Sequence, residues 1–306
     1  MARRRKKGRD VSGILVLDKP RGYSSNQALQ TVRRLFNARK AGHTGNLDPM
    51  ATGVLPICLG EATKVSAFLL DADKGYHGTI QLGVTTDSGD AEGEVVETRP
   101  VPELDPERVE AVLARFRGPI EQLPPMYSAV KQGGQPLYKL AREGREVERK
   151  PRPVTIHDLQ ATGIGVDTID IEVHCTKGTY IRTLAEEIGE ALGCGGHLSA
   201  LSRTRAGPFD MAQAVSLEHL EAVAAEERSA LDALLMPAER GLEDWPRVQL
   251  SRTGAFYVRQ GQPVQVPGAP IDGMVRLFEG EELFLGIGHI LDDGRVAPKR
   301  LLVGSG

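Results

Sequence analysis

Residues 39–60 read RKAGHTGNLDPMATGVLPICLG, and they hold one carboxylate, Asp48, among glycine, proline, threonine and small apolar residues. The three inner glycines can adopt backbone angles that other residues avoid, and Pro49 pushes Asp48 toward an extended conformation. Such a stretch resists regular helix and can direct one side chain into a cleft. The composition alone is equally typical of an Asx turn, in which Asp48 bonds its own backbone.

The whole stretch is more specific than an isolated Asp-Pro pair. Residues 42–64, GHTGNLDPMATGVLPICLGEATK, resemble the signature loop of the TruB family of pseudouridine synthases, which act on uridine 55 of bacterial tRNA. The resemblance implies that Asp48 is the catalytic residue. The family usually has threonine or a small residue where this chain has Asn46, a change that could alter hydrogen bonds in the loop but leaves the carboxylate in place.

Length and composition set the broad class. The chain has 306 residues, 40% apolar and 26% charged, which predicts a soluble protein with a sizeable core and two domains. Its three cysteines are widely separated and lack metal-type spacing, so we expect a reducing, cytoplasmic compartment. No apolar run approaches about 18 residues, so no membrane span is expected. Without metal spacing, a P-loop or a dinucleotide fingerprint, no cofactor is expected.

The charge is unevenly distributed. The net charge of −3 provides no overall attraction for nucleic acid, yet residues 1–10 hold six basic side chains against Asp10, or +5, which leaves −8 for the rest. This pattern predicts a basic flexible arm over residues 1–10 that either contacts phosphates or only keeps the protein in solution. RNA binding would then need further basic residues gathered on one face.

Hydrophobic periodicity predicts the regular elements and the domains. A break at residues 244–246 separates a catalytic domain, residues 11–243, from residues 247–306, whose short apolar runs and glycine turns predict a small β domain. The mixture of strands and helices is of the α+β class. Strands are expected over 14–17, 76–83, 154–163 and 168–175, and helices over 61–70 and 217–236 and after Ser24 or Ser25 and Asp105.

The resemblance adds a specific architecture. It implies the pseudouridine-synthase fold, a large mixed and mostly antiparallel sheet flanked by helices, with a cleft across it. It also implies that the small C-terminal β domain is PUA-like and binds RNA. Residues 86–93, TDSGDAEG, form a polar turn that the family shares, and residues 122–144 match the family or, on composition, form a proline-rich connection to a short helix.

Other matching stretches imply the rest of the site. Alternation alone places Tyr76 in the core, but the family's tyrosine here stacks on the target base. Within residues 197–209, the family's leucine that packs against that base falls on Leu201. His43 is expected to stack in or near the space that the flipped base vacates. The family usually has arginine where this chain has Ser202, so one phosphate contact would be missing.

Arg182 is also marked by local physical chemistry. With Thr179 as the helix N-cap, Arg182 lies in the first turn, where its charge opposes the helix dipole and where a capping box would place Glu or Gln. A local rule broken in this way indicates function, and a carboxylate partner would compensate. In the family the corresponding arginine pairs with the catalytic aspartate, which implies a pair between Arg182 and Asp48.

The implied reaction is the isomerisation of uridine 55 in the T-loop of tRNA to pseudouridine, which requires the base to be flipped out of its stack. Asp48 would act either as a nucleophile or as a base. The expected partner is the tRNA T-stem-loop, with no obligate protein partner, no membrane and a monomeric protein. Possible RNA contacts are the basic residues Lys19, Arg39, Lys64, Lys131, Arg142, Lys177, Arg203 and Arg205.

Two alternatives stay open. A non-catalytic tRNA-binding protein or folding chaperone would use the same arm, cleft and β domain, although intact Asp48, Tyr76 and Arg182 favour catalysis. A guide-RNA-dependent synthase of the archaeal and eukaryotic type is the second alternative. The small C-terminal domain favours a stand-alone bacterial form over that one.

Overall fold

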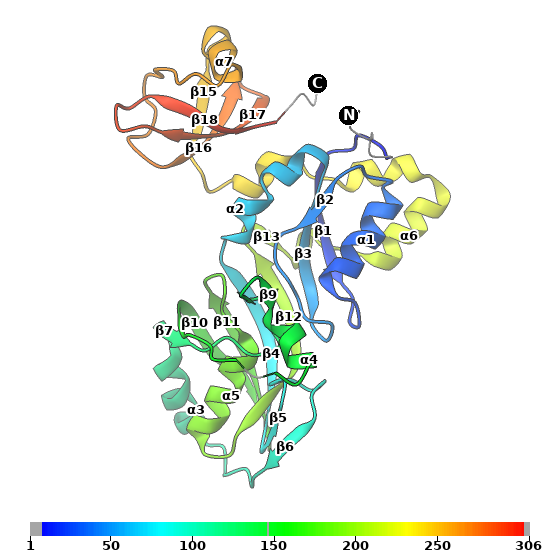
Figure 1. Cartoon of the computed structure of the whole chain (residues 1–306), viewed down its shortest axis with the longest axis vertical. Coiled ribbons are helices and arrows are strands. Elements are labelled where there is room, and N and C mark those ends of the chain that lie inside the picture. The colour runs from blue at the N-terminus through cyan, green and yellow to red at the C-terminus, as the bar shows by residue number, and fades with distance from the viewer. Residues whose placement is uncertain (1–7, 146, 303–306) are drawn as a thin grey trace. The chain divides into compact units, whose positions relative to one another are not determined.

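The computed structural model describes residues 8–145 and 147–302. Contacts divide the chain into two compact units, whose elements are labelled in Figure 1. Unit 1 takes in the chain up to Pro49, Gly53–Asp71 and the chain from Ala206 on, and unit 2 takes in Met50–Thr52 and Ala72–Arg205. Asp48 therefore belongs to unit 1, whereas the other central candidates, Tyr76, Arg182 and Leu201, belong to unit 2.

The first strands of unit 1 are buried and antiparallel. β1 (Gly13–Lys19) pairs with β3 (Thr52–Leu59) from Gly13 opposite Leu59 to Lys19 opposite Gly53. The apolar run from Ile14 to Leu17 is almost fully buried, which confirms the strand predicted there. β2 (Ala41–His43) pairs antiparallel with β3, and β14 (Val215–Ser216) pairs parallel with β1.

The first helix, α1 (Ser25–Leu35), begins where its cap was predicted. Ser24 forms a capping box with Gln27, because each side chain bonds the backbone of the other residue. Ala28, Leu29 and Val32 form its buried face.

Two predicted helices are wrong as single elements. Residues 61–70 form a 3-10 turn, η1 (Gly60–Lys64), and a short helix, α2 (Ser66–Leu70). The hydroxyls of Thr63 and Ser66 each donate to the carbonyl three residues earlier, at 2.7 and 2.8 Å, and so compete with the helical ladder. Residues 217–236 divide at Glu227, whose backbone is extended, into α6 (Leu217–Glu226) and the 3-10 turn η4 (Arg228–Leu234).

The predicted C-terminal β sheet is present. Its order is β15-β16-β17-β18, and the sequence did not indicate the added helix α7 (Arg252–Arg259), which Ser251 caps. Ile287 of this sheet is fully buried in a cluster that also holds Ile14 and Val16 of β1, and the rings of Phe68 and Trp245 meet edge to face at 5.2 Å. The strands are β15 (Arg247–Leu250), β16 (Met274–Glu279), β17 (Leu283–Ile290) and β18 (Val296–Leu301).

Unit 2 is built on a mainly antiparallel sheet in the order β12-β4-β11-β10-β7. The predicted strand over residues 168–175 is confirmed at both ends, and it pairs antiparallel with both of its neighbours. The strands are β4 (Lys74–Leu82), β7 (Gly118–Gln122), β10 (Arg152–Ile164), β11 (Thr168–Cys175) and β12 (Gly196–Ala206).

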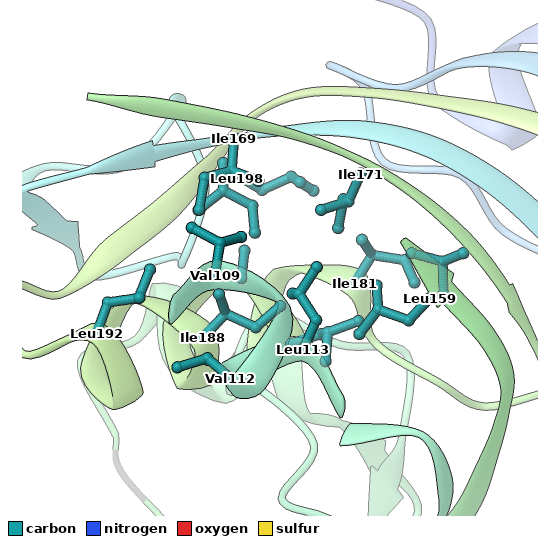
Figure 2. Close-up of a cluster of buried hydrophobic side chains, with 14 of the residues drawn as sticks. Val109, Val112, Leu113, Leu159, Ile169, Ile171, Ile181, Ile188, Leu192 and Leu198 are labelled. Atoms are coloured by element: carbon teal, nitrogen blue, oxygen red, sulfur yellow. The ribbon is translucent and has the colours of Figure 1, made fainter. Parts of the chain in front are cut away.

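Two helices supply the other half of the core of unit 2. α3 (Pro106–Leu113) begins after Asp105 with proline at its first position, as predicted, and α5 (Ile181–Leu192) follows β11. Figure 2 shows the side chains of Val109 and Leu113 from α3 and Ile188 from α5 gathered with those of the sheet. These layers confirm an α+β fold with a mixed, mostly antiparallel sheet flanked by helices.

Shorter elements complete the description. β5 (Val84–Thr86) and β6 (Val95–Thr98) form a hairpin around the polar turn, and β8 (Lys131–Gln132) and β9 (Gln135–Pro136) precede the short helix α4 (Leu137–Arg142). Cys58, Cys175 and Cys194 are all buried and unpaired. Among the described residues, no helix has the length and apolar character needed to span a membrane.

Candidate active site

The loop that carries Asp48 is anchored on both sides of the aspartate. The buried hydroxyl of Ser25 accepts a hydrogen bond from the backbone N–H of Leu47 at 2.7 Å and donates to its carbonyl at 3.1 Å. On the other side, the carbonyl of Pro49 accepts from the N–H of Gly22 at 2.7 Å. Asp48 itself is half-buried. Its backbone is thereby fixed to the start of α1 and to the end of the β1 region.

Lys19 supports the same loop from inside the protein. Its side chain is fully buried, and its ammonium group donates to the carbonyls of Pro20 at 2.9 Å, Tyr23 at 2.6 Å and Pro49 at 3.5 Å. Lys19 was expected among the possible RNA contacts, but its ammonium group is buried and bonds backbone carbonyls instead. A buried lysine requires such acceptors because burial otherwise disfavours its charge.

His43 and Asn46 lie in the same loop. His43 ends β2 opposite Ile57 and is half-buried, and Asn46 is exposed. Between them, Thr44 is buried and its N–H donates to the carbonyl of Pro56 at 3.1 Å. The role of His43 beside a flipped base stays a prediction.

Tyr76 and Leu201 lie on neighbouring strands of unit 2. Tyr76 on β4 and Leu201 on β12 are both partly buried, and both pack against the core cluster of that unit. Gly78 makes room between the strands, since a Cβ atom there would lie 3.5 Å from Cδ1 of Leu201 and 3.3 Å from Cδ1 of Leu198. The two residues expected to contact the target base therefore lie on neighbouring strands and pack against one core, and their roles stay predictions.

Arg203 has a different place from the one predicted. It is 1% exposed, and its guanidinium forms a side-chain hydrogen bond with Tyr76. Burial lowers the pKa of Arg203, while the interaction with Tyr76 acts in the opposite direction. Alternation along β12 puts residues 201 and 203 on one face, which is the sequence signal that could have indicated this position. Arg203 thus supports Tyr76 and does not face solvent.

Arg182 lies in the first turn of α5, as predicted, but the cap is Tyr180 and not Thr179. The Thr179 hydroxyl donates to the carbonyl of Thr176 at 3.0 Å, so it does not cap the helix. Arg182 is 4% exposed and donates to two backbone carbonyls, Ser88 at 2.9 Å and Tyr127 at 2.7 Å. These bonds fix the plane of its guanidinium.

A carboxylate partner of Arg182 is Asp90, which sequence analysis missed. The two side chains are almost fully buried, with 3.5 Å between Nη1 of Arg182 and Oδ2 of Asp90. The other oxygen, Oδ1, accepts from the Ser88 hydroxyl at 2.7 Å and from the N–H of Glu92 at 3.0 Å. The polar turn 86–93 therefore holds the carboxylate for Arg182. The implied pair between Arg182 and Asp48 joins the two units and stays a prediction.

The remaining basic candidates occupy varied positions. Arg39 pairs with Asp10 at 3.4 Å. Lys64 pairs with Glu61 and donates to the carbonyl of Leu301 at 2.7 Å. Arg142 ends α4, and its side chain lies outside the described part of the structure. Lys131, Lys177 and Arg205 are exposed, and their contact with RNA stays a prediction.

The predicted arm falls largely outside the described residues, which begin at Gly8. Arg9 forms an ion pair with Asp232, and its N–H donates to the carbonyl of Asn37 at 2.6 Å. Residue 9 is therefore held against unit 1 by its backbone and its side chain.

No metal centre is found in the part of the chain that the structure covers. Among residues 8–145 and 147–302, no three His, Cys, Asp or Glu side chains gather in a way that could hold a metal ion. The expectation that activity needs no metal stays a prediction.

Family comparisons cover nearly the whole chain. Residues 33–181 match "TruB family pseudouridylate synthase (N terminal domain)", residues 182–243 match "tRNA pseudouridylate synthase B C-terminal domain", and residues 246–302 match "Pseudouridine synthase II TruB, C-terminal".

Whole-length relatives agree with these matches. Proteins named tRNA pseudouridine synthase B are 59% identical in Ectopseudomonas mendocina, over 99% of both chains, and 57% identical in Nitrosococcus oceani, over 98% of this chain and 97% of the relative. A chain in a solved Cbf5-Nop10-Gar1 complex is 26% identical with a TM-score of 0.75, over 95% of this chain and 85% of that one. The protein therefore belongs to the TruB family of pseudouridylate synthases.

Proposed function

We propose that this protein isomerises uridine 55 in the T-loop of tRNA to pseudouridine, with Asp48 as the catalytic carboxylate. The observation that carries the proposal is 57–59% identity, over nearly the full length of both chains, to relatives named tRNA pseudouridine synthase B. The anchored loop supports it, because a backbone fixed at Leu47 and Pro49 holds the Asp48 carboxylate in a defined position.

The reaction is a rearrangement. The bond between N1 of uracil and C1′ of ribose breaks, the uracil turns, and a bond between C5 and C1′ forms. C5 loses a proton and N1 gains one, so the net composition and oxidation state do not change. Asp48 serves either as the nucleophile or as the base in this sequence, in keeping with the precedent of carboxylates at sugar centres.

The base must leave its stack before it can turn. Tyr76 stacks on the extruded uracil and Leu201 packs against it. Their shared packing in the core of unit 2 supports this pairing of roles. The hydrogen bond from Arg203 holds the Tyr76 hydroxyl, which restricts rotation of the ring. His43 fills or lines the space that the base vacates, and Arg182 favours the ionised form of Asp48.

The protein acts on tRNA alone, as a monomer in the cytoplasm, with no obligate protein partner and no cofactor. The nearly end-to-end match with relatives named tRNA pseudouridine synthase B, a name that mentions no other protein, supports the lack of a partner. The structural neighbour solved in a Cbf5-Nop10-Gar1 complex differs in this respect, because it is found there together with other proteins. The exposed Lys131, Lys177 and Arg205 provide contacts to tRNA phosphates.

The deciding experiment gives purified protein an unmodified tRNA transcript and no other component. We expect pseudouridine at position 55, detected by mass spectrometry, and no product from a transcript with cytidine at that position. Asp48→Asn should bind the tRNA with nearly unchanged affinity but lose at least about a thousandfold in single-turnover rate, because the amide can neither attack nor accept a proton.

Asp244→Asn is the matched control, since Asp244 is an exposed aspartate of the same unit, and it should convert tRNA at the wild-type rate. Binding without conversion by the wild-type protein would instead indicate a non-catalytic tRNA-binding protein. Conversion only after a guide RNA is added would indicate the guide-dependent class. Substantial turnover by Asp48→Asn would remove Asp48 from the chemistry.

A further inference from the structure

Glu186 adjoins both Arg182 and the polar turn that holds it. It lies on α5 four residues after Arg182, so the two side chains are neighbours on one face of the helix. Its carboxyl group also lies against Gly89, because a Cβ atom at position 89 would come within 2.9 Å of both Cδ and Oε1 of Glu186. Glycine at this position, where φ is +73°, leaves the space that the carboxyl group occupies.

Gly89 stands between the two groups of the turn that receive Arg182. The carbonyl of Ser88 lies 2.9 Å from Nη1 of the arginine, and Oδ2 of Asp90 lies 3.5 Å from the same nitrogen. The backbone of Gly89 bonds elsewhere: its N–H donates to the carbonyl of Thr86 at 3.3 Å, and its carbonyl accepts from Leu198 at 3.0 Å. A shift of Gly89 would therefore move together the two groups of the turn that receive Arg182, the carbonyl of Ser88 and the carboxylate of Asp90.

We propose that Glu186 is a positioning residue for Arg182: its carboxyl group, packed against Gly89, fixes the turn 86–93 where Ser88 and Asp90 receive the guanidinium. Glu186 acts through Arg182 and does not touch the uracil. The inference rests on the proposed function, because it is there that Arg182 serves the isomerisation.

The charge of Glu186 affects how well its carboxyl group packs against Gly89 and beside Asp90. The charged groups around it are Arg182, Glu187, Arg149 and Asp90. Burial outweighs the attraction of the two arginines and raises the pKa of Glu186 to about 7. Below that pH the neutral carboxyl group packs beside Asp90 without repulsion. Above it, the carboxylate repels Asp90 and draws the guanidinium toward itself, so we expect the chemical step to slow as the pH rises through about 7.

The test measures single-turnover conversion of a T-stem-loop at saturating protein, over about two pH units on either side of that pKa. Glu186→Gln keeps the shape of the side chain and cannot ionise. It should match the wild-type rate at the acidic end and lose the alkaline decline due to this group. Glu186→Ala removes the packing against Gly89 and should lower the rate about ten- to a hundredfold at every pH, with RNA affinity nearly unchanged.

Glu187→Gln is the matched control. Glu187 is the next residue on α5, and burial raises its pKa as well, but the three atoms nearest to a Cβ at position 89 all belong to Glu186. This variant should keep both the wild-type rate and the alkaline decline. If Glu187→Gln lost the decline while Glu186→Gln kept it, the titrating group would be Glu187 and the charge dependence of Glu186 would be overturned.

Several outcomes decide the matter. A wild-type rate in Glu186→Ala overturns the positioning role, and an unchanged decline in Glu186→Gln overturns its dependence on charge. Melting curves show whether Glu186→Ala folds. If it does not, the pH profile of the isosteric Glu186→Gln still tests whether the state of this side chain affects the chemical step. A wild-type protein that converts no RNA rejects the proposed function itself, whereas a converting wild type with insensitive Glu186 variants rejects only the positioning role.

Discussion

At the scale of single residues, charged side chains turned inward set up the site. Lys19, Arg182 and Arg203 are each less than 5% exposed, although lysine and arginine are rarely buried unless they are paired. Each of them bonds a group near the candidate site. Lys19 donates to the carbonyl of Pro49, Arg182 donates to the turn 86–93, and Arg203 donates to the hydroxyl of Tyr76. Cations in this protein therefore shape the interior as well as any RNA-binding face.

The pair formed by Tyr76 and Arg203 leads to a prediction. Tyr76→Phe keeps the ring for stacking but removes an acceptor from a guanidinium that is 1% exposed. A buried polar group left unsatisfied costs about 1–3 kcal/mol, so the free energy of unfolding of the variant should fall by that amount. The variant should therefore unfold at a lower denaturant concentration than the wild type. Chemical denaturation measures the difference.

The control is Tyr257→Phe, at a tyrosine of α7 that is 44% exposed, and it should change stability by less than about 0.5 kcal/mol. Equal stabilities of the two variants would mean that the hydrogen bond contributes nothing net. In the double variant Tyr76→Phe with Arg203→Met, part of the loss should be recovered, because removing both partners leaves no buried charge unsatisfied.

At the scale of elements, the first turn of helix α1 holds the backbone of the loop that carries Asp48. Its cap, Ser24, precedes Ser25, whose buried hydroxyl holds the backbone of Leu47. Ser24→Ala should cost about 1 kcal/mol in unfolding free energy, since it removes the capping box. Hydrogen exchange at the amide of Leu47 should quicken in the same variant, because fraying of the first turn loosens Ser25.

Ser229→Ala provides the comparison, at an exposed serine whose hydroxyl bonds the nearby Glu227. It should leave both the stability and the exchange at Leu47 unchanged. Unaltered exchange at Leu47 in Ser24→Ala would show that the loop is held independently of the helix end.

Local signals predicted most elements well and failed where apolar spacing does not reveal the deciding contact. The cap at Ser24, the proline start at Pro106 and the alternation over residues 168–175 need only neighbouring residues, and all were confirmed. The helix over 61–70 failed because side-chain hydroxyls of Thr63 and Ser66 compete with the backbone, which apolar spacing does not reveal.

The candidate site shows the same division. The stretch around Asp48 could be singled out by its composition and resemblance, and Arg182 by its unfavourable place in a helix's first turn. Asp90 was missed because it looked like any aspartate of a polar turn, and only the fold brings it to Arg182. The burial of Lys19 and Arg203 was missed for the same reason, since charged residues are expected at the surface.

At the scale of the whole molecule, the C-terminal sheet shares a core with the first strand. Ile287 of β17 is fully buried in the cluster that contains Ile14 and Val16 of β1. Ile287→Ala should therefore cost about 2–5 kcal/mol and also speed hydrogen exchange in β1, which a separately folded accessory domain would not do. Ile271→Ala, at a residue that is 90% exposed, should affect neither quantity.

Exchange that quickens only within the strands of the C-terminal sheet would show that this sheet opens alone. Together with its family match at residues 246–302, that result would favour an accessory domain that can be removed without harm to the rest. Coupled opening would mean instead that a truncation at the predicted boundary uncovers apolar side chains such as Phe68, which packs on Trp245.

The three buried cysteines make the folded protein unreactive toward thiol reagents. Burial raises the pKa of Cys58 to about 12 and that of Cys175 to about 11, and it also raises the pKa of Cys194. Oxidants and alkylating reagents attack the thiolate, which is scarce at such pKa values and enclosed besides. While it stays folded, the protein thus behaves toward thiol-directed reagents as though it had no cysteine, and each thiol becomes reactive only when its own part of the core opens.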